Sequence, residues 1–207
     1  MIGNCNIILF EDDLPDGLEL GDEVAVDTEA MGLNIHNDRL CLVQIATSSG
    51  KCFLIKIGRT IGPAPNLKKV LSSSRIAKIF HFARFDVALL NKAFDIRVDN
   101  IFCTKIASRL ARSFTNKHGL KDLCYNLLGI ELVKQQQTSD WGKNNLTQEQ
   151  LKYAADDVLY LHRLKEILLE ILVREGRDRL ACDCFKAIGV ITSLDAVGIN
   201  FDDLFSH

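Results

Sequence analysis

Two acidic residues stand just past a short apolar run, where a strand is expected to end. Asp27 and Glu29 directly follow Val24–Val26, and residues two apart on an extended chain point to the same side. Two carboxylates placed in this way at the end of a buried strand repel each other unless a cation lies between them. Hard divalent cations such as Mg²⁺ and Mn²⁺ take oxygen ligands. The pair therefore predicts a metal site, with a solvated pair of loop acids as the alternative.

A tyrosine and an aspartate share one face of a predicted helix further along the chain. Tyr153 and Asp157 are four residues apart, a spacing that makes two side chains neighbours on a helix surface. This face is otherwise apolar, and a buried carboxylate without a partner is costly. Asp157 is therefore a candidate metal ligand, whereas Asp156, one step round the helix, is expected on the surface.

A third acidic segment enters a helix after another predicted strand. The stretch His81–Asp86 follows the run Ile76–Phe80 and brings an imidazole, two aromatic rings and a carboxylate to the end of that strand. Asp86 could instead be an N-terminal helix acid that interacts with the helix dipole. Taken together, the three segments offer the carboxylate set that two-metal phosphodiester cleavage requires. Zinc fits less well, because these clusters lack His and Cys ligands.

The elements that must position these residues follow from the apolar patterning. Three predicted strands in quick succession indicate an antiparallel meander, after which strands alternate with helices and helices then dominate. Thr147 and Gln150 form a predicted capping box at the start of the helix that carries Tyr153. The expected strands cover 24–26, 40–46, 52–57, 76–80 and 98–102, and the expected helices 67–71, 85–94, 104–111, 120–128 and 148–174, with one more helix and an irregular tail over 176–207. This order predicts a mixed α/β sheet flanked by helices.

Composition and charge narrow the class of protein. The 207 residues, 47% of them hydrophobic, fit a single domain over 1–207 with a catalytic core at about 20–175. A net charge of −2 argues against a non-specific polyanion binder. Residues 1–38 nevertheless hold ten acids and no Lys or Arg, whereas 101–121 hold five basic residues and no acid. One region therefore suits cations and the other phosphates.

The sequence also bears on where the protein works. No stretch approaches the length of an apolar membrane span, and the N-terminus lacks the pattern of a secretory signal. Seven cysteines, mostly within apolar runs, favour reduced thiols over a disulfide framework. We therefore expect a cytoplasmic protein that does not enter a membrane.

The order and spacing of the acidic segments resemble the exonuclease motifs of the ribonuclease D group. This group belongs to the four-carboxylate exonucleases with a ribonuclease H-like fold, so the resemblance implies a mixed five- to six-stranded sheet flanked by helices. Asp27 and Glu29 match the first motif, Asp86 the second, and Tyr153 with Asp157 the third, as in the tyrosine subgroup. The stretches 137–141 and 146–150 are also similar to ribonuclease D, and the resemblance covers about residues 20–170.

A closer resemblance is to nanoRNase C, the compact branch of this group. Ribonuclease D itself carries C-terminal helical nucleic-acid-binding domains, which residues 176–207 are expected to be too few to contain. The resemblance implies hydrolysis of short RNAs, dinucleotides above all, to nucleoside 5′-monophosphates at the end of RNA decay, by a ring-like homo-octamer. It rests on Lys78–Phe82, Arg84–Asp86, Phe102–Ser108, His118–Lys121, Lys134–Gln137 and Val158–Lys165.

The same resemblance implies a role for each motif residue, with two divalent cations, Mg²⁺ or Mn²⁺, held by the four acids. Asp27, Glu29 and Asp157 would hold the ion that binds the attacking water. Asp27 would also bridge to the second ion, which Asp86 would support mainly through water. Tyr153 would orient the attacking water and keep its proton, since an ordinary tyrosine has a pKa near 10.

Candidate substrate contacts surround these motifs, and each has an ordinary structural alternative. Met31 and Leu33 could wedge against the terminal base, or be core residues. Phe82 and Phe85 could stack on a base, or pack beneath the helix. His81 could contact the scissile phosphate or a ribose hydroxyl. The candidates for a cap on a 5′-phosphate, which could equally be solvated surface residues, are Arg84, Arg112, Lys117, His118, Lys134 and Gln137.

Three other functions are open from the sequence alone. One is general RNA 3′-end processing like that of ribonuclease D. Another is a DNA 3′→5′ exonuclease, because the carboxylate core is indifferent to the sugar and discrimination needs a 2′-hydroxyl contact. The last is an inactive nucleic-acid-binding scaffold, which the presence of all four acids and the tyrosine disfavours.

Overall fold

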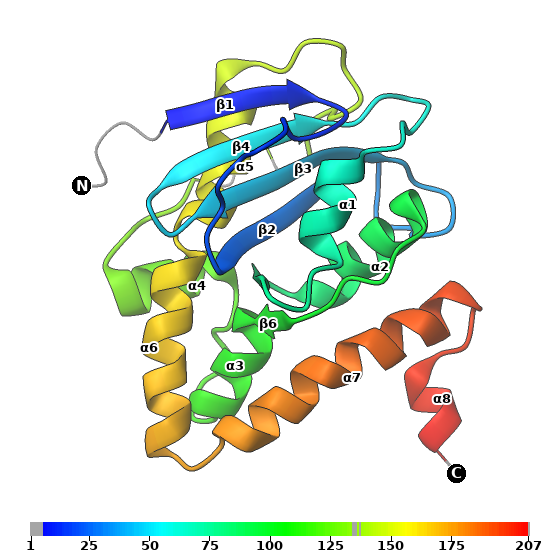
Figure 1. The fold of residues 1–207 in the computed structure, drawn as a ribbon. Coiled ribbons are helices and arrows are strands. Elements are labelled where there is room, and N and C mark those ends of the chain that lie inside the picture. Colours follow the sequence, from blue (N-terminus) through cyan, green and yellow to red (C-terminus); the bar gives the residue numbers. More distant parts are fainter. Residues whose placement is uncertain (1–5, 134–135, 137, 207) are drawn as a thin grey trace.

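A six-stranded sheet lies at the centre of the molecule (Figure 1). The structure, a computed structural model, describes residues 6–133, 136 and 138–206. The strands are β1 (Asn6–Glu11), β2 (Glu23–Ala30), β3 (Leu40–Thr47), β4 (Lys51–Lys56), β5 (Ala77–Phe80) and β6 (Ile101–Cys103), in the order β1-β4-β3-β2-β5-β6. As predicted, β2, β3 and β4 form an antiparallel meander, whereas β1, β5 and β6 are added in parallel. This mixed sheet confirms the predicted fold class.

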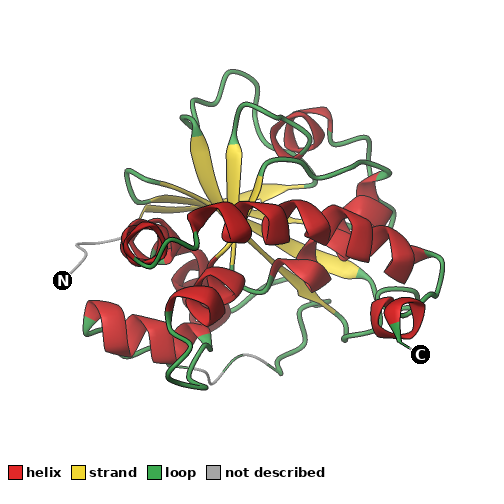
Figure 2. Cartoon of the chain, turned by 90° about the horizontal axis from the view of Figure 1, so that it is seen from below, coloured by secondary structure: helices red, strands yellow, loops and turns green. Residues whose placement is uncertain are grey.

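The central strand β3 is buried at every position, because helices cover both faces of the sheet. In Figure 1, α1 (Pro65–Leu71) and α2 (Ala83–Phe94) lie on one face, and α5 (Gln148–Leu159) lies on the other. Figure 2 shows the strands as a twisted fan with helices packed around it. A strand that is covered on both faces is expected to consist almost entirely of apolar residues. Leu40–Ala46 fits this expectation except at Gln44.

The remaining helices stand beside the sheet. Helix α6 packs against α3, and α7 packs against α2 and α3 along the lower edge of the molecule in Figure 1. These elements are α3 (Thr104–Ala111), α4 (Leu120–Leu123), the π-helical turn η1 (Cys124–Leu128), α6 (Leu161–Arg174), α7 (Asp178–Ala196) and α8 (Phe201–Phe205). Over the residues that the structure describes, no helix has the length and apolar character needed to cross a membrane.

Several predicted elements differ from the structure. The helix expected over 148–174 is two helices that meet at Tyr160, because α5 packs on β2, β3 and β4 whereas α6 packs on α3. Each part therefore buries its apolar face against a different main partner. The strand expected over 98–102 begins only at Ile101, since Asn100 has a left-handed backbone with a φ of 51°. The helix expected over 120–128 is α4 followed by η1, and the tail expected to be irregular contains α8.

The start of α5 confirms the predicted capping box. The Gln150 N–H donates to Thr147 Oγ1 at 3.3 Å, and the Thr147 N–H donates to Gln150 Oε1 at 3.0 Å. The Gln150 amide also donates to Ser139 Oγ at 3.0 Å and to the Asp140 carbonyl at 3.2 Å. These bonds fix where α5 begins, and thereby which of its side chains lie over the sheet.

Candidate active site

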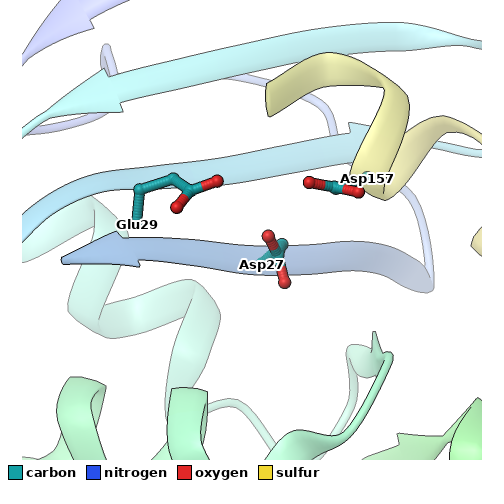
Figure 3. A group of neighbouring side chains, drawn as sticks. All are labelled: Asp27, Glu29 and Asp157. Carbon is teal, nitrogen blue, oxygen red and sulfur yellow. The ribbon is translucent and has the colours of Figure 1, made fainter. Parts of the chain in front are cut away.

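Three carboxylates converge between strand β2 and helix α5. One oxygen from each of Asp27, Glu29 and Asp157 lies within 4.8 Å of the others, and Figure 3 shows the three side chains gathered in the space between β2 and α5. Asp27 and Glu29 share one face of β2 because they are two residues apart. Asp157 comes from α5, which packs across β2, β3 and β4. Glu29 and Asp157 are 128 residues apart in the sequence, yet the sheet and the helix bring them together.

The fourth predicted acid lies beside this group. Asp86 stands in the first turn of α2 and is buried, and Thr28 Oγ1 donates a hydrogen bond to Asp86 Oδ1 at 2.6 Å. Thr28 lies between Asp27 and Glu29 on β2, so this bond ties the first acidic motif to the second. Sequence reasoning assigned Thr28 no role, although it occupies the middle of the Asp27–Glu29 motif.

Burial and mutual repulsion raise the pKa of Asp27, Glu29 and Asp86 when no cation is near. Desolvation is the main cause, and the charges of Asp157 and Asp86 add to it, so the pKa of Glu29 rises to about 9. The same burial raises the pKa of Asp86 to about 7, against the hydrogen bond from Thr28, which lowers it. The pKa of Asp27 lies well above its ordinary value because of burial and then the neighbouring charge of Asp86.

This donor set suits hard divalent cations. All of the converging groups offer carboxylate oxygens, which are the ligands that Mg²⁺ and Mn²⁺ prefer. A cation among them would offset both the repulsion and the desolvation that raise the pKa of these acids. The residues present therefore fit the divalent metals that the sequence predicts.

Tyr153 lies one helical turn before Asp157 and faces the same acids. Its pKa is raised far above the ordinary value, first by burial and then by the charge of Asp157, to which its hydroxyl is hydrogen-bonded. The phenol therefore stays protonated throughout the physiological pH range. Its ring packs against the buried Trp141, with the ring centroids 6.0 Å apart. Trp141 thus helps to fix the position of the hydroxyl.

The aromatic and apolar substrate candidates fall into two groups. Leu33 is 88% exposed and Met31 52% exposed, so the alternative of core residues is wrong for both. Phe82 is exposed in a left-handed turn with a φ of 69°, and Lys105 Nζ lies 3.8 Å from the centre of its ring. Phe85 packs partly buried against the core, as its structural alternative predicted.

His81 is anchored at the end of β5. Its Nδ1 lies 2.9 Å from Thr104 Oγ1, and this hydroxyl donates to the Phe80 carbonyl at 3.0 Å. Because the single hydroxyl proton of Thr104 is used in that bond, Thr104 accepts from His81, and Nδ1 carries a proton. The sequence offered no signal for this role of Thr104.

The basic candidates are engaged within the protein to different degrees. Arg84 forms two hydrogen bonds with Asp195, Nε to Oδ2 at 2.8 Å and Nη2 to Oδ1 at 2.6 Å. Arg112 is buried and donates to the Lys117 carbonyl at 3.2 Å, while the Lys117 side chain is exposed. His118 is buried, with Nδ1 at 2.8 Å from Ser108 Oγ. The two remaining candidates, Lys134 and Gln137, lie outside the described residues.

Comparisons with known proteins place the chain among 3′-5′ exonucleases. A family model described as 3′-5′ exonuclease matches residues 10–173. Ribonuclease D from Gluconacetobacter diazotrophicus is 34% identical over 161 residues, which are 77% of this chain and 40% of that protein. NrnC from Brucella melitensis bound to pGG is 47% identical with a TM-score of 0.94, over 99% of this chain and 100% of that one. NrnC with bound Mg²⁺ is 46% identical with a TM-score of 0.92, over 98% and 99%.

The chain belongs to the 3′–5′ exonuclease family. Enzymes of this family depend on divalent metal ions, and the acids assembled by β2 and α5 provide the matching ligands. Within the family, the similarity to NrnC along the whole chain confirms the predicted resemblance to compact, ribonuclease D-like nanoRNase C. The chain spans about 40% of the length of the ribonuclease D proteins that it matches.

Proposed function

We propose that this protein is a metal-dependent 3′→5′ exoribonuclease that hydrolyses short RNAs, dinucleotides above all, to nucleoside 5′-monophosphates at the end of RNA decay. The observation that carries the proposal is the convergence of Asp27, Glu29 and Asp157 within 4.8 Å. Support for a short substrate comes from the similarity to NrnC, which has been solved with pGG. The proposed unit is a single exonuclease domain over 1–207 with its catalytic core at about 20–175.

Each acid has a proposed task in positioning the reaction. Asp27, Glu29, Asp86 and Asp157 hold two divalent cations, Mg²⁺ or Mn²⁺, which when bound activate the attacking water and stabilise the leaving oxygen. Asp86 is fixed by its hydrogen bond from Thr28, so its carboxylate keeps a constant direction. The charges of Asp86, Asp157 and Glu29 all raise the pKa of Asp27, which suits the proposed bridging of both cations by this carboxylate.

Tyr153 orients the attacking water through its hydroxyl. The raised pKa of this phenol disfavours a role as a base near neutral pH. A protonated hydroxyl beside Asp157 can donate to one oxygen and accept from another, which suits the placement of a water molecule. The Trp141 ring that packs against Tyr153 restricts the hydroxyl to this position.

The substrate is proposed to be held at its bases, its sugar and its 5′ end. Met31, Leu33 and Phe82 present exposed apolar surface next to the acidic motifs, and such surface can stack on or wedge against bases. Phe85 is a further proposed base contact, although it packs partly buried against the core, and His81 is the proposed contact to the scissile phosphate or a ribose hydroxyl. The proposed cap for a 5′-phosphate is drawn from Arg84, Arg112, Lys117, His118, Lys134 and Gln137.

We also propose a cytoplasmic homo-oligomer, with the octamer as the assembly that the resemblance implies. An octamer would have a mass near eight times 23.2 kDa. Size-exclusion chromatography with light scattering measures this mass directly. A species of that size supports the octamer, and a monomer at micromolar concentration contradicts it.

A direct comparison of substrates tests the proposed function. Purified protein with Mg²⁺ is given a 5′-phosphorylated diribonucleotide, the matching deoxydinucleotide and a longer single-stranded RNA, with the Asp27→Ala variant as the control for contaminating nucleases. A strong preference for the diribonucleotide, lost in the variant, is the expected result. Faster trimming of the longer RNA would favour general 3′-end processing, which the similarity to ribonuclease D makes the second candidate. Preferred cleavage of the deoxydinucleotide would favour DNA ends, and no cleavage at all would favour a scaffold.

A further inference from the structure

A buried amide lies beneath the candidate active site without a hydrogen-bond partner. Gln44 is completely buried in β3, and neither its Nε2 nor its Oε1 forms a hydrogen bond with any residue that the structure describes. Buried amides are almost always hydrogen-bonded, because burial removes their bonds to water. An apolar residue of similar size would satisfy the packing of β3 at lower cost. The amide therefore calls for an explanation beyond the fold.

The strand register places Gln44 beside a metal-ligand candidate. Gln44 and Asp27 are directly paired across the antiparallel strands β3 and β2. Side chains paired in this way point to the same face of the sheet, with Cβ atoms about 4.5–5.5 Å apart. The same face carries Glu29, paired with Leu42, and receives α5 with Tyr153 and Asp157. Gln44 thus belongs to the floor of the carboxylate group.

The other neighbours of Gln44 on this face have no polar side-chain atoms. Leu42 and Ala46 flank it along β3 on the same side, and Leu54 is its partner on β4. All three are buried and apolar. The polar side chains placed on this face are those of Asp27 and Glu29 on β2 and of Tyr153 and Asp157 on α5, and Asp27 is the one paired with Gln44 across the strands.

We propose that Gln44 is a positioning residue for the metal-binding carboxylates and acts through Asp27. An ionised carboxylate only accepts hydrogen bonds, and the Gln44 Nε2 can donate two. A bond from Nε2 to one Asp27 oxygen, directly or through one buried water, would hold that carboxylate in a single orientation and leave its other oxygen for a cation. The inference rests on the proposed function, because it assigns Gln44 to the metal site of that function.

Groups that form hydrogen bonds with a metal ligand, and so orient it, affect the affinity for the metal measurably. Losing such a partner typically weakens metal binding about 10–100-fold. A merely structural glutamine would behave differently, since replacing a buried, unpartnered amide by an apolar residue leaves a distant ligand unchanged and stabilises the fold. If Gln44 is a positioning residue, replacing it by an apolar residue should therefore maintain or raise the stability of the fold and lower the affinity for metal.

The test measures Mg²⁺ binding by calorimetry and thermal unfolding in EDTA for wild type, Gln44→Met and the control Leu54→Met. Met has nearly the volume of Gln without its amide, and Leu54→Met changes the neighbouring packing while leaving Gln44 in place. We expect Gln44→Met to unfold at the same or a higher temperature in EDTA and to bind Mg²⁺ about 10–100-fold more weakly. Leu54→Met should bind Mg²⁺ within about twofold of wild type, because conservative swaps in a core cost little.

Unchanged Mg²⁺ affinity in a folded Gln44→Met variant would overturn the inference. If that variant does not fold, Gln44→Asn takes its place, because the shorter side chain keeps an amide but draws it back from Asp27 by one methylene. Weakened Mg²⁺ binding by Gln44→Asn supports the inference, and wild-type binding overturns it. Measurements on the wild-type protein distinguish failure of this inference from failure of the proposed function. Calorimetry can show Mg²⁺ binding even where no RNA is cleaved, and failure of cleavage then rejects only the function.

Discussion

The Arg84 guanidinium and the Asp195 carboxylate form a two-point ion pair between residues 111 apart in the chain, with contacts of 2.8 and 2.6 Å. Arg84 stands in the first turn of α2, two residues before Asp86, and Asp195 lies near the end of α7. The pair therefore connects α7 to the segment that carries one of the four acids. The pair also engages the Arg84 side chain, which the sequence analysis names as a candidate contact for a 5′-phosphate.

We expect Arg84→Ala and Asp195→Ala to have similar, modest effects. The Arg84 side chain is 46% exposed, so solvent screens the pair and each variant should lose no more than about 1 kcal/mol of unfolding free energy. If the pair is structural, the KM for a 5′-phosphorylated dinucleotide should change by less than about threefold in both variants, given that small loss. Chemical denaturation and steady-state kinetics measure the two quantities. A KM raised tenfold or more in Arg84→Ala alone would instead assign Arg84 to the phosphate.

Asp157→Asn should separate activity from stability. The variant removes one of three negative charges that lie within 4.8 Å of one another, so the metal-free protein should become more stable. Activity with Mg²⁺ should fall at least about 100-fold, since even the loss of groups behind the metal ligands costs 10–100-fold. Melting temperature in EDTA and cleavage of a dinucleotide measure the two effects.

A surface substitution provides the matched control for this variant. Asp203→Asn removes a charge of the same kind from the exposed helix α8. Its activity and its melting temperature should equal those of wild type. Full activity of Asp157→Asn would contradict the proposed metal site. A lower melting temperature of this variant in EDTA would contradict the repulsion among the acids.

Much of the site can be predicted from the sequence because its residues follow local periodicities. Asp27 and Glu29 are two apart on a strand, and Tyr153 and Asp157 are four apart on a helix whose capping box the sequence also displays. Each spacing fixes a shared face before any tertiary contact is known. The predicted bounds of α3 also agree with the structure. This helix, Thr104–Ala111, begins directly after the short strand β6.

The features that the sequence does not predict depend on contacts between distant segments. The helix break at Tyr160 arises because α5 and α6 pack on different partners, and no local propensity records that change. The Arg84–Asp195 pair joins α2 to α7. Gln44 is an intermediate case, because one amide within an apolar strand is visible in the sequence, whereas its pairing with Asp27 requires the strand register.

Tyr153→Phe should reduce the rate without weakening metal binding. The substitution keeps the ring that packs on Trp141 and removes only the hydroxyl beside Asp157. We expect kcat to fall about 100-fold, because a misplaced reacting group can cost about that much in rate. The affinity for Mg²⁺, measured by calorimetry, should rise or stay the same, because the phenol is not a ligand. A tenfold loss of Mg²⁺ affinity would show that the ring position is disturbed and would contradict a role confined to water.

The stability of the metal-free protein should fall as the pH rises from about 4 to 9. Burial raises the pKa of Asp86 to about 7 and that of Glu29 to about 9, above the ordinary values of 3.8 and 4.5. Between the ordinary and the raised pKa, the folded protein keeps a proton that the unfolded chain has released. The unfolding free energy therefore declines with pH by up to about 1.4 kcal/mol per pH unit for each such group.

Mg²⁺ should reverse this decline, because it binds the ionised carboxylates and offsets their repulsion. The difference in melting temperature between Mg²⁺ and EDTA is therefore expected to grow steadily from pH 5 to pH 9, with Glu29→Gln showing a shallower slope in EDTA. Lys69→Gln, which exchanges an ordinary side chain of α1 outside the carboxylate group, should follow the wild-type curve. Unfolding in EDTA that is independent of pH over this range would mean that the acids are not buried together in the metal-free protein. An effect of Mg²⁺ equal at pH 5 and pH 9 would mean that the cation binds elsewhere.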